Sequence, residues 1–421
     1  MPDGVAEALA LAVLAGVLAF AVIRPRDLPE AVGAVPGALL LGATGVVGWA
    51  EAGRHLLGLF PTVLFLAGVL MLAHLCRAEG MFAAAGDLMA RRSGGRPVRL
   101  LALVFGVASV TTAVLSLDAT VVLLTPVVFA TASRLGVRPK PHVYATTHLA
   151  NSASLLLPVS NLTNLLALGA SGLTFAGFAA LMAGPLLAAL AVEFAVFRWY
   201  FGAELSVRAA PRASEATRTP RFALVVLGLT LLGFVASSPL HVEPFWAALA
   251  GAAVLAVKRV IAAPRDAGRE LRELGASANP WFLAFVAALS VVVQAVVDHG
   301  VADALRAVLP RGDGLPSLLP LAGLAALLAN LVNNLPAVPL LLPLVAASGP
   351  VAVLAVLIGV NVGPNLTYVG SLATLLWRRI MTDHHHDAEI AEFTRLGLLT
   401  VPLTLVASTV ALWAGALLMG D

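Results

Sequence analysis

Charged residues and cysteine are scarce in this sequence. Asp, Glu, Lys and Arg together make up 12% of its 421 residues, whereas a soluble globular domain has about 25%. That deficit excludes a soluble enzyme, a nucleic-acid-binding domain and a disordered chain, because each needs a polar or charged surface. The single cysteine, Cys76, leaves no partner for an intrachain disulfide and no thiolate cluster for a metal ion.

Apolar residues dominate what remains. Hydrophobic residues make up 60% of the chain, and the mean hydropathy is +0.94. At roughly 20 residues per span, this is enough for on the order of a dozen membrane helices. The apolar runs are long rather than alternating, which excludes a β-barrel. We therefore expect an all-α polytopic membrane protein that needs no cofactor.

Arginine clusters predict the topology, because basic loops stay in the cytoplasm. The first apolar run, Val5–Ile23, is followed by Arg24 and Arg26, so we expect the amino terminus outside. Asp3 before the run and arginines after it reverse the charge order of a signal peptide. Further spans are predicted at 31–49, 56–75, 173–197, 222–237, 245–261, 281–297 and 396–419, the last ending outside.

Two pairs of apolar segments indicate re-entrant hairpins. Residues 100–132 have basic residues on both sides and a polar tip near Ser116–Thr120. A second pair, 318–347, is interrupted at Asn333 and Asn334. Two further helices, 142–170 and 351–377, contain so many Asn, Ser, Thr and Pro residues that we expect each to be broken in the middle. Polar backbone at this depth is tolerated only where protein or a water-filled cavity surrounds it.

The two halves follow one plan. Each half has five membrane crossings, one of which is a broken helix, and in addition one hairpin. The whole chain therefore has about ten full spans plus two re-entrant hairpins. An odd number of crossings turns the second half upside down, the inverted-topology repeat of many secondary transporters. We predict a first repeat at 1–203, a cytoplasmic linker at 204–221 and a second repeat at 222–421. Two short matches favour this division: Asn161-Leu-Thr163 with Asn365-Leu-Thr367, and Ser116-Leu-Asp118 with Val332-Asn-Asn334.

The four interruptions would meet near the membrane midplane and form a polar cavity. Asn, Ser and Thr both donate and accept hydrogen bonds. Such a cavity suits a small neutral or weakly charged solute with several hydroxyls, or an alkali ion held by backbone carbonyls. The alternative is that these residues only hydrogen-bond between helices. The candidate substrate-binding residues are Asn151, Ser152, Asn161, Thr163, Asn333, Asn334, Asn361, Asn365 and Thr367.

Asp118 and His148 are the candidate proton-coupling residues. Asp118 lies in an apolar region near a hairpin tip, where an ionisable group is a functional hypothesis by default, although it could also cap the helix that follows. His148 is either a second titrating group or a packed polar residue. Glu193 is expected to pair with Arg198 near a cytoplasmic end. The run Asp383-His-His-His-Asp387 is expected to be a solvated loop, and no basic residue is expected at the cavity.

At these motifs the sequence resembles the arsenite efflux permeases of the ion transporter superfamily. The string from Gly359 to Trp377 is similar to a signature of that family, and Asn333-Asn-Leu-Pro336 resembles its second hairpin tip. The run from Asp118 to Pro126 and the string Leu157-Pro-Val-Ser-Asn-Leu-Thr-Asn164 resemble the first-half counterparts. The similarity extends in order from the first hairpin to Trp377.

The resemblance implies export of arsenite and antimonite as neutral trihydroxides across the bacterial inner membrane, in exchange for protons and by an elevator-type motion. It also implies that a separate soluble ATPase subunit is an optional partner. Where some members of the family carry Asp, this chain has Asn151 and Asn361, which leaves Asp118 as the main candidate proton carrier. The oligomeric state is left open, with a homodimer as one candidate.

Three other functions are weighed. A sodium- or proton-coupled carrier of another small oxyanion or carboxylate would have the same architecture. An intramembrane enzyme would need a nucleophile with a base, or a metal motif such as His-Glu-x-x-His, and neither is present in the apolar segments. A passive channel is disfavoured, because broken helices in inverted repeats are typical of carriers. We therefore predict a transporter and not an enzyme.

Overall fold

The computed structural model describes residues 3–23, 25–206, 219–301, 308–310, 312–383 and 389–419. Every regular element in these ranges is helical, which confirms the all-α prediction. Most of the predicted linker 204–221 and the three histidines after Asp383 lie outside the described residues.

The described residues of the first half form fifteen helical elements, several of them single turns. They are α1 (Asp3–Ile23), η1 (Pro25–Asp27), α2 (Ala31–Ala43), α3 (Trp49–Ala78), α4 (Met81–Ser93), α5 (Pro97–Val114), α6 (Leu117–Ala119), η2 (Thr120–Leu124), α7 (Thr125–Arg134), α8 (Lys140–Ser152), η3 (Ala153–Leu155), η4 (Pro158–Ser160), α9 (Leu162–Ser171), α10 (Phe175–Tyr200) and α11 (Gly202–Leu205).

The second half repeats much of this order in its described residues. Its elements are α12 (Arg221–Ser237), α13 (Phe245–Ala262), η5 (Pro264–Asp266), α14 (Ala267–Ser277), α15 (Pro280–Val296), η6 (Val297–Val301), α17 (Leu315–Val332), α18 (Asn334–Val345), η7 (Ala346–Ser348), α19 (Pro350–Val362), η8 (Gly363–Asn365), η9 (Tyr368–Gly370), α20 (Leu372–Asp383) and α21 (Ile390–Met419).

Nine segments of the described chain are long and apolar enough to cross a membrane, by length and composition. They include both arms of the first hairpin and one arm of the second. Shorter apolar helices lie in other predicted segments, including one piece of each broken helix: Ala31–Ala43, Leu162–Ser171, Arg221–Ser237, Asn334–Ser348 and Pro350–Asn365. The chain is therefore a multi-pass membrane protein of the predicted architecture.

The two broken helices have the same construction. α8 begins at Lys140 and α19 at Pro350, 210 residues later, and the three elements that follow each of them begin at the same interval. Each break ends on an extended residue, Asn161 in the first and Ser371 in the second. Asn161 is therefore the structural counterpart of Ser371 and not of Asn365. The predicted match of Asn161-Leu-Thr163 with Asn365-Leu-Thr367 is wrong, because those residues are 204 apart.

The two hairpin tips also correspond. In the first, α5 ends before Ser116, whose side chain accepts a hydrogen bond from the Ala119 N–H at 3.1 Å. In the second, α17 ends before Asn333, whose side chain accepts from the Leu335 N–H at 3.3 Å. Counted from these caps, the position of Asp118 corresponds to Leu335. The first tip therefore carries a carboxylate that the second one lacks.

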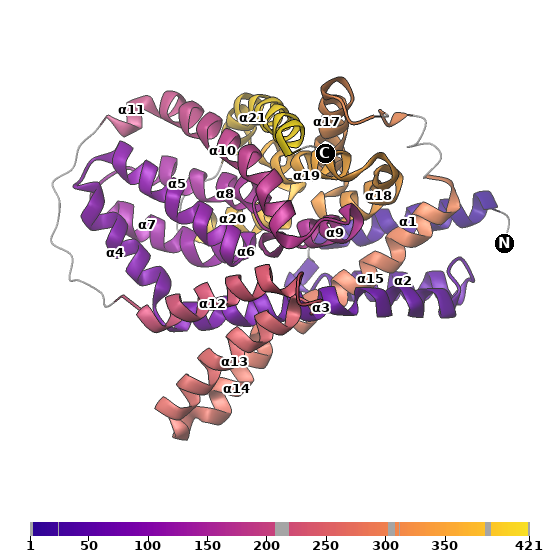
Figure 1. Ribbon diagram of the computed structural model, residues 1–421, viewed down its shortest axis with the longest axis horizontal. Coiled ribbons are helices and arrows are strands. Elements are labelled where there is room, and N and C mark those ends of the chain that lie inside the picture. The colour runs from indigo at the N-terminus through magenta and orange to yellow at the C-terminus, as the bar shows by residue number, and fades with distance from the viewer. Residues whose placement is uncertain are drawn as a thin grey trace.

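The helices pack into two bodies (Figure 1). The scaffold layer comprises α1–α3 and α12–α15, in which α3 packs on α13 and α15 packs on α1 and α2. The hairpin body comprises α4–α11 and α17–α21, in which α10 packs on α21, α17 on α19 and α5 on α8. Both hairpins and both broken helices thus belong to the same body, and one face of that body lies against the scaffold layer.

Candidate functional site

A cavity of about 1030 Å³ lies between the two bodies. The scaffold layer contributes Glu30, residues of α3 from Phe65 to Arg77, and Asn279 and Phe282 at the start of α15. The hairpin body contributes the first hairpin tip, the end of the first break, the start of α18 and the start of α20. The predicted meeting of hairpin tips and breaks in one cavity is therefore present.

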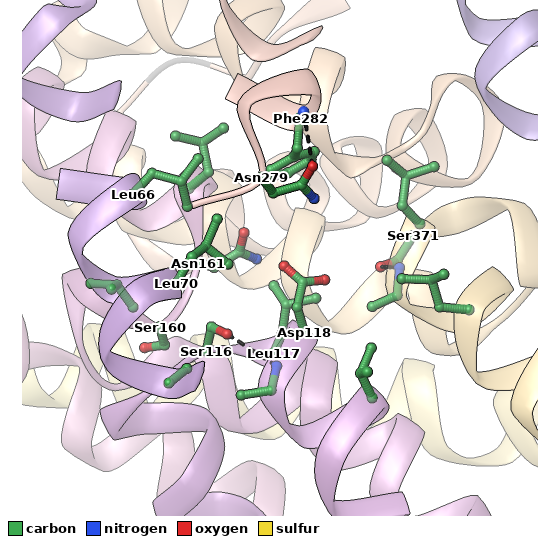
Figure 2. A pocket seen from close by; sticks show the side chains of 18 of the residues that line it. Leu66, Leu70, Ser116, Leu117, Asp118, Ser160, Asn161, Asn279, Phe282 and Ser371 are labelled. Atoms are coloured by element: carbon green, nitrogen blue, oxygen red, sulfur yellow. Dashed lines mark hydrogen bonds between the residues drawn. The ribbon is translucent and has the colours of Figure 1, made fainter. Parts of the chain in front are cut away.

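The wall formed by the hairpin body combines apolar side chains with a group of polar ones. The polar residues at the hairpin tips and at the ends of the breaks are Ser116, Asp118, Ser160, Asn161, Asn334 and Ser371, and Figure 2 shows several of them around one space. Asn161 accepts a hydrogen bond from the Thr163 N–H at 3.3 Å, and Ser371 accepts from the Ala373 N–H at 3.2 Å. Together with Ser116, these residues cap three helix N-termini at the cavity, where backbone N–H groups and the helix dipole favour electron-rich oxygens.

Asp118 lies in the first turn of α6, two residues after the cap at Ser116. Its carboxylate points into the cavity between Asn161 and Ser371 (Figure 2). Glu30 of the scaffold layer lines the same cavity, so two carboxylates face it from opposite bodies. Ser116, and not Asp118, caps α6, which removes the alternative role considered for Asp118.

Seven of the nine predicted binding residues do not line the cavity, and five of these seven form one group. These five are buried where the two broken helices cross, and they are Asn151, Ser152, Thr163, Asn361 and Asn365. The Asn151 amide donates to Asn365 Oδ1 at 2.8 Å and to Thr374 Oγ at 3.2 Å. Asn365 donates in turn to Ser152 Oγ at 2.9 Å. These bonds join the two breaks to each other.

Asn361 is the centre of a second set of bonds. Its Oδ1 accepts from Thr163 Oγ at 2.9 Å and from the Asn161 amide at 3.2 Å. Its own amide donates to Asn164 Oδ1 at 2.7 Å. Asn164 also donates to the Ser154 carbonyl at 2.5 Å. Asn161 thus belongs both to the cavity wall and to the network behind it.

The remaining predicted residues lie elsewhere. Thr367 donates to Asn330 Oδ1 at 2.7 Å, and Asn333 donates to the Val369 carbonyl at 2.9 Å. His148 is fully buried, and its ring lies 5.0 Å from Phe197 and 5.7 Å from Phe393. Both ring nitrogens lack a hydrogen-bond partner in the described part of the chain. Only Asp118, Asn161 and Asn334 of the predicted set line the cavity.

Two expectations about charge are wrong. Glu193 does not pair with Arg198: it is fully buried, and its Oε1 accepts from Ser152 Oγ at 2.5 Å and from the Asn365 amide at 3.2 Å. Basic residues also line the cavity, namely His74 and Arg77 from α3 and Arg378 and Arg379 from α20. Ser152 and Asn365 lie on other helices than Glu193, and the basic residues reach the cavity from α3 and α20. The sequence of a single apolar segment does not show such contacts between helices.

Other cavity residues gave weaker signals in the sequence. Ser160 and Ser371 belong to the predicted polar interruptions but are less conspicuous than the asparagines beside them. Asn279 stands immediately before Pro280 and caps α15, accepting from the Phe282 N–H at 3.3 Å. Among the described residues, no group of three or more His, Cys, Asp or Glu side chains could hold a metal ion.

Comparison with known proteins agrees with this geometry. A family described as "Citrate transporter" matches residues 17–365. The uncharacterized transporter Rv2685 of Mycobacterium tuberculosis is 29% identical over 402 residues, which cover 89% of this chain and 91% of that protein. The arsenical pump membrane protein of Escherichia coli K12 is 28% identical over 419 residues, which cover 94% and 96%.

A solved structure shares the fold. The YdaH transporter of Alcanivorax borkumensis superposes with a TM-score of 0.61 at 16% identity, over 93% of this chain and 97% of that chain. The resemblance to arsenite efflux permeases is confirmed by the arsenical pump relatives, and the relatives are transporters. With a matching stretch of 349 residues that includes both hairpins, the first break and the beginning of the second, the chain belongs to the CitMHS family of citrate transporters.

Proposed function

We propose that the protein is a secondary active transporter that exports arsenite and antimonite, as neutral trihydroxides, in exchange for protons. The observation that carries this proposal is the cavity wall, in which Ser116, Asn161, Asn334 and Ser371 surround one carboxylate, Asp118. A trihydroxide has three O–H donors and several acceptor lone pairs, which hydroxyl and amide side chains match.

The absence of a thiol from the cavity lining supports release of the cargo. The single cysteine, Cys76, is buried and is not among the lining residues. Thiolates would hold soft arsenic tightly, whereas hydrogen bonds to oxygen break easily. We therefore expect weak, reversible binding, as a carrier requires.

We assign proton coupling to Asp118 rather than to His148. Asp118 reaches the cavity, so a proton and the cargo would compete for the same space and bind alternately. His148 is enclosed by aromatic rings and does not line the cavity. Alternating access would arise as the hairpin body slides against the scaffold layer, carrying the wall of the cavity with it.

The cellular setting is part of the same proposal. We place the protein in the bacterial inner membrane with both termini outside. The cavity reaches Arg77, Arg378 and Arg379, and basic helix ends lie in the cytoplasm, so the structure would be open to the cytoplasm. From the family resemblance we propose a soluble ATPase subunit as an optional partner, and a homodimer is one candidate for the oligomeric state.

The second candidate function is a sodium- or proton-coupled carrier of another oxyanion or a carboxylate. The three arginines at the cavity favour it, because guanidinium groups bind carboxylates well. The description of the matching family as citrate transporters points the same way. Against it, Asp118 and Glu30 place negative charge at the same cavity.

Uptake into everted membrane vesicles separates the two functions. With an imposed gradient that is acidic inside, the first function predicts arsenite accumulation that citrate does not inhibit and that sodium does not stimulate. Accumulation of citrate, or strict dependence on sodium, would favour the second. A companion assay, growth of an arsenite-sensitive host that carries the gene, tests export in the cell.

A further inference from the structure

Glu193 is a carboxylate with no role in the cavity. It lies within the 26-residue helix α10, its relative exposure is 0%, and it is not among the cavity-lining residues. A buried carboxylate in a membrane helix is costly and calls for an explanation.

Its contacts come from both broken helices. Oε1 accepts hydrogen bonds from the Ser152 hydroxyl at 2.5 Å and from the Asn365 amide at 3.2 Å. Ser152 ends α8 in the first half, and Asn365 lies in the break of the second half. Glu193 is thus the third member of the junction that joins the two breaks.

The other carboxylate oxygen is unsatisfied. Glu193 Oε2 is buried and has no hydrogen-bond partner in the described part of the chain. A structural acceptor would need only one oxygen, which an amide or a hydroxyl supplies without the cost of burying an acid. The unpaired oxygen leaves a position where a proton can bind without breaking any bond of the junction.

The neighbouring titratable groups do not neutralise this carboxylate through an ion pair. On α8, His148 turns its ring to Phe197 and Phe393, and His142 bonds to the carbonyls of Arg138 and Pro97. On α21, Glu392 pairs with Lys140 at 2.5 Å, and Arg395 is exposed. No described Lys, Arg or His nitrogen forms an ion pair with Glu193.

We propose that Glu193 is a second proton-binding site of this transporter, placed behind the cavity at the junction of the two broken helices. The proton binds at Oε2 and leaves from it while Oε1 keeps its bonds to Ser152 and Asn365. In the charged state Glu193 holds Ser152 and Asn365 strongly, since hydrogen bonds to an ionised acceptor are the stronger ones. In the neutral state the hydrogen bonds from Ser152 and Asn365 to Glu193 are weaker. Binding of the proton would therefore weaken the connection between the two broken helices.

The network gives this change a route to the cavity. Asn365 bonds to Asn151, and the Asn151 carbonyl accepts from Ser154 Oγ at 2.6 Å. The Ser154 carbonyl accepts a hydrogen bond from the Asn164 amide. Asn164 is also bonded to Asn361, and Asn361 is bonded to Asn161 at the cavity wall. The inference deepens the proposed function, because it rests on transport being coupled to protons.

Infrared spectroscopy of the purified full-length protein tests the site without any substrate. Titration with acid should produce a carboxylic-acid C=O band that disappears in Glu193→Gln and persists in Asp118→Asn. The matched control Glu243→Gln, at an exposed loop position, should leave it unchanged. A titrating spectrum that is identical in wild type and Glu193→Gln would overturn the proposal.

A second variant keeps the test decisive if Glu193→Gln fails to fold. Ser152→Ala removes one donor to the charged form, so the midpoint of the same band should move to higher pH by about one unit or more, the equivalent of a lost charge-assisted hydrogen bond. An unmoved midpoint would contradict the assignment. If the band behaves as expected but the protein moves no arsenite, the proton site stands and the proposed cargo is wrong.

Discussion

Asp118 and Asn361 show two different uses of polar side chains inside a membrane protein. Asp118 points into the cavity and is available to a solute (Figure 2). Asn361 is 1% exposed, and its amide group makes three hydrogen bonds to neighbouring side chains. The first residue is placed to act on a cargo, and the second is placed to hold the broken helices together.

Asp118→Asn should abolish proton-driven accumulation of arsenite while the protein still folds. Asn preserves the shape of the side chain but cannot bind and release a proton in this pH range. The measurement is arsenite uptake into everted vesicles with and without an imposed pH gradient. Asp266→Asn, at an exposed position in η5, serves as the control. Full gradient-driven uptake by Asp118→Asn would exclude Asp118 as the coupling group.

Asn361→Ala should lower stability first and transport as a consequence. The substitution removes one buried hydrogen bond from each of Asn161, Thr163 and Asn164, at a cost of about 2 kcal/mol or more. Thermal unfolding in detergent measures the effect, with Thr44→Ala at a more exposed helix end as the control. An unchanged melting temperature would show that this network is not needed to hold the breaks.

Sequence patterns predicted which residues are polar and deep, but not which of them face the cavity. The asparagines of the breaks are conspicuous because apolar runs surround them. Whether a given one faces solute or another helix depends on how two helices 210 residues apart cross. Glu193 shows the same limit: along α10 its nearest opposite charge is Arg198, but its partners are Ser152 and Asn365 of other helices.

At the scale of elements, the breaks are packed tightly against their neighbours. α21 passes the second break at Gly397, where an added Cβ would lie 2.4 Å from the Asn365 carbonyl oxygen and 2.8 Å from the Leu366 Cα. Both atoms belong to backbone and do not move easily. Glycine at 397 therefore allows the long helix to approach the junction that contains Asn365.

Gly397→Ala should destabilise the protein and impair transport, because α21 must move away from the break. Gly415→Ala lies in the same helix but meets no atom within 4 Å, so it should leave both properties unchanged. Comparing the melting temperatures of the two variants isolates the close contact from any general effect of replacing glycine in a helix. Equal melting temperatures and equal transport in the two variants would contradict the close contact between Gly397 and the second break.

The order of elements was predictable, whereas the register of the repeat was not. Pro158 forces Leu157 into extended backbone, so a break near that position follows from the sequence. The equivalence of the halves follows from the helix boundaries, and it pairs Asn161 with Ser371. The three-residue match at a spacing of 204 arose by coincidence and pointed to the wrong pairs.

At the scale of the whole molecule, the cavity is bounded by two separate bodies. One side is α3 and the start of α15, and the other is made of hairpin and break residues. A relative motion of the two bodies would open and close such a cavity without breaking the core of either one.

Single cysteines should report which side the cavity opens to. In a Cys76→Ala background, Val122→Cys on the hairpin body and Leu70→Cys on α3 both line the cavity. A membrane-impermeant maleimide should label them in everted vesicles and not in right-side-out cells. Ser408→Cys, whose parent side chain is buried and bonded to the Pro185 carbonyl, should remain unlabelled in both. Labelling from the outer side alone would reverse the proposed orientation.

The central claim is that this cavity carries neutral arsenite against a counterflow of protons. The most direct test is radiolabelled arsenite uptake by the purified protein in proteoliposomes with an acidic interior. We predict accumulation that collapses when a protonophore is added, is absent in Asp118→Asn and is unaffected by citrate. Uptake of citrate with no uptake of arsenite, or arsenite uptake that ignores the proton gradient, would contradict the account.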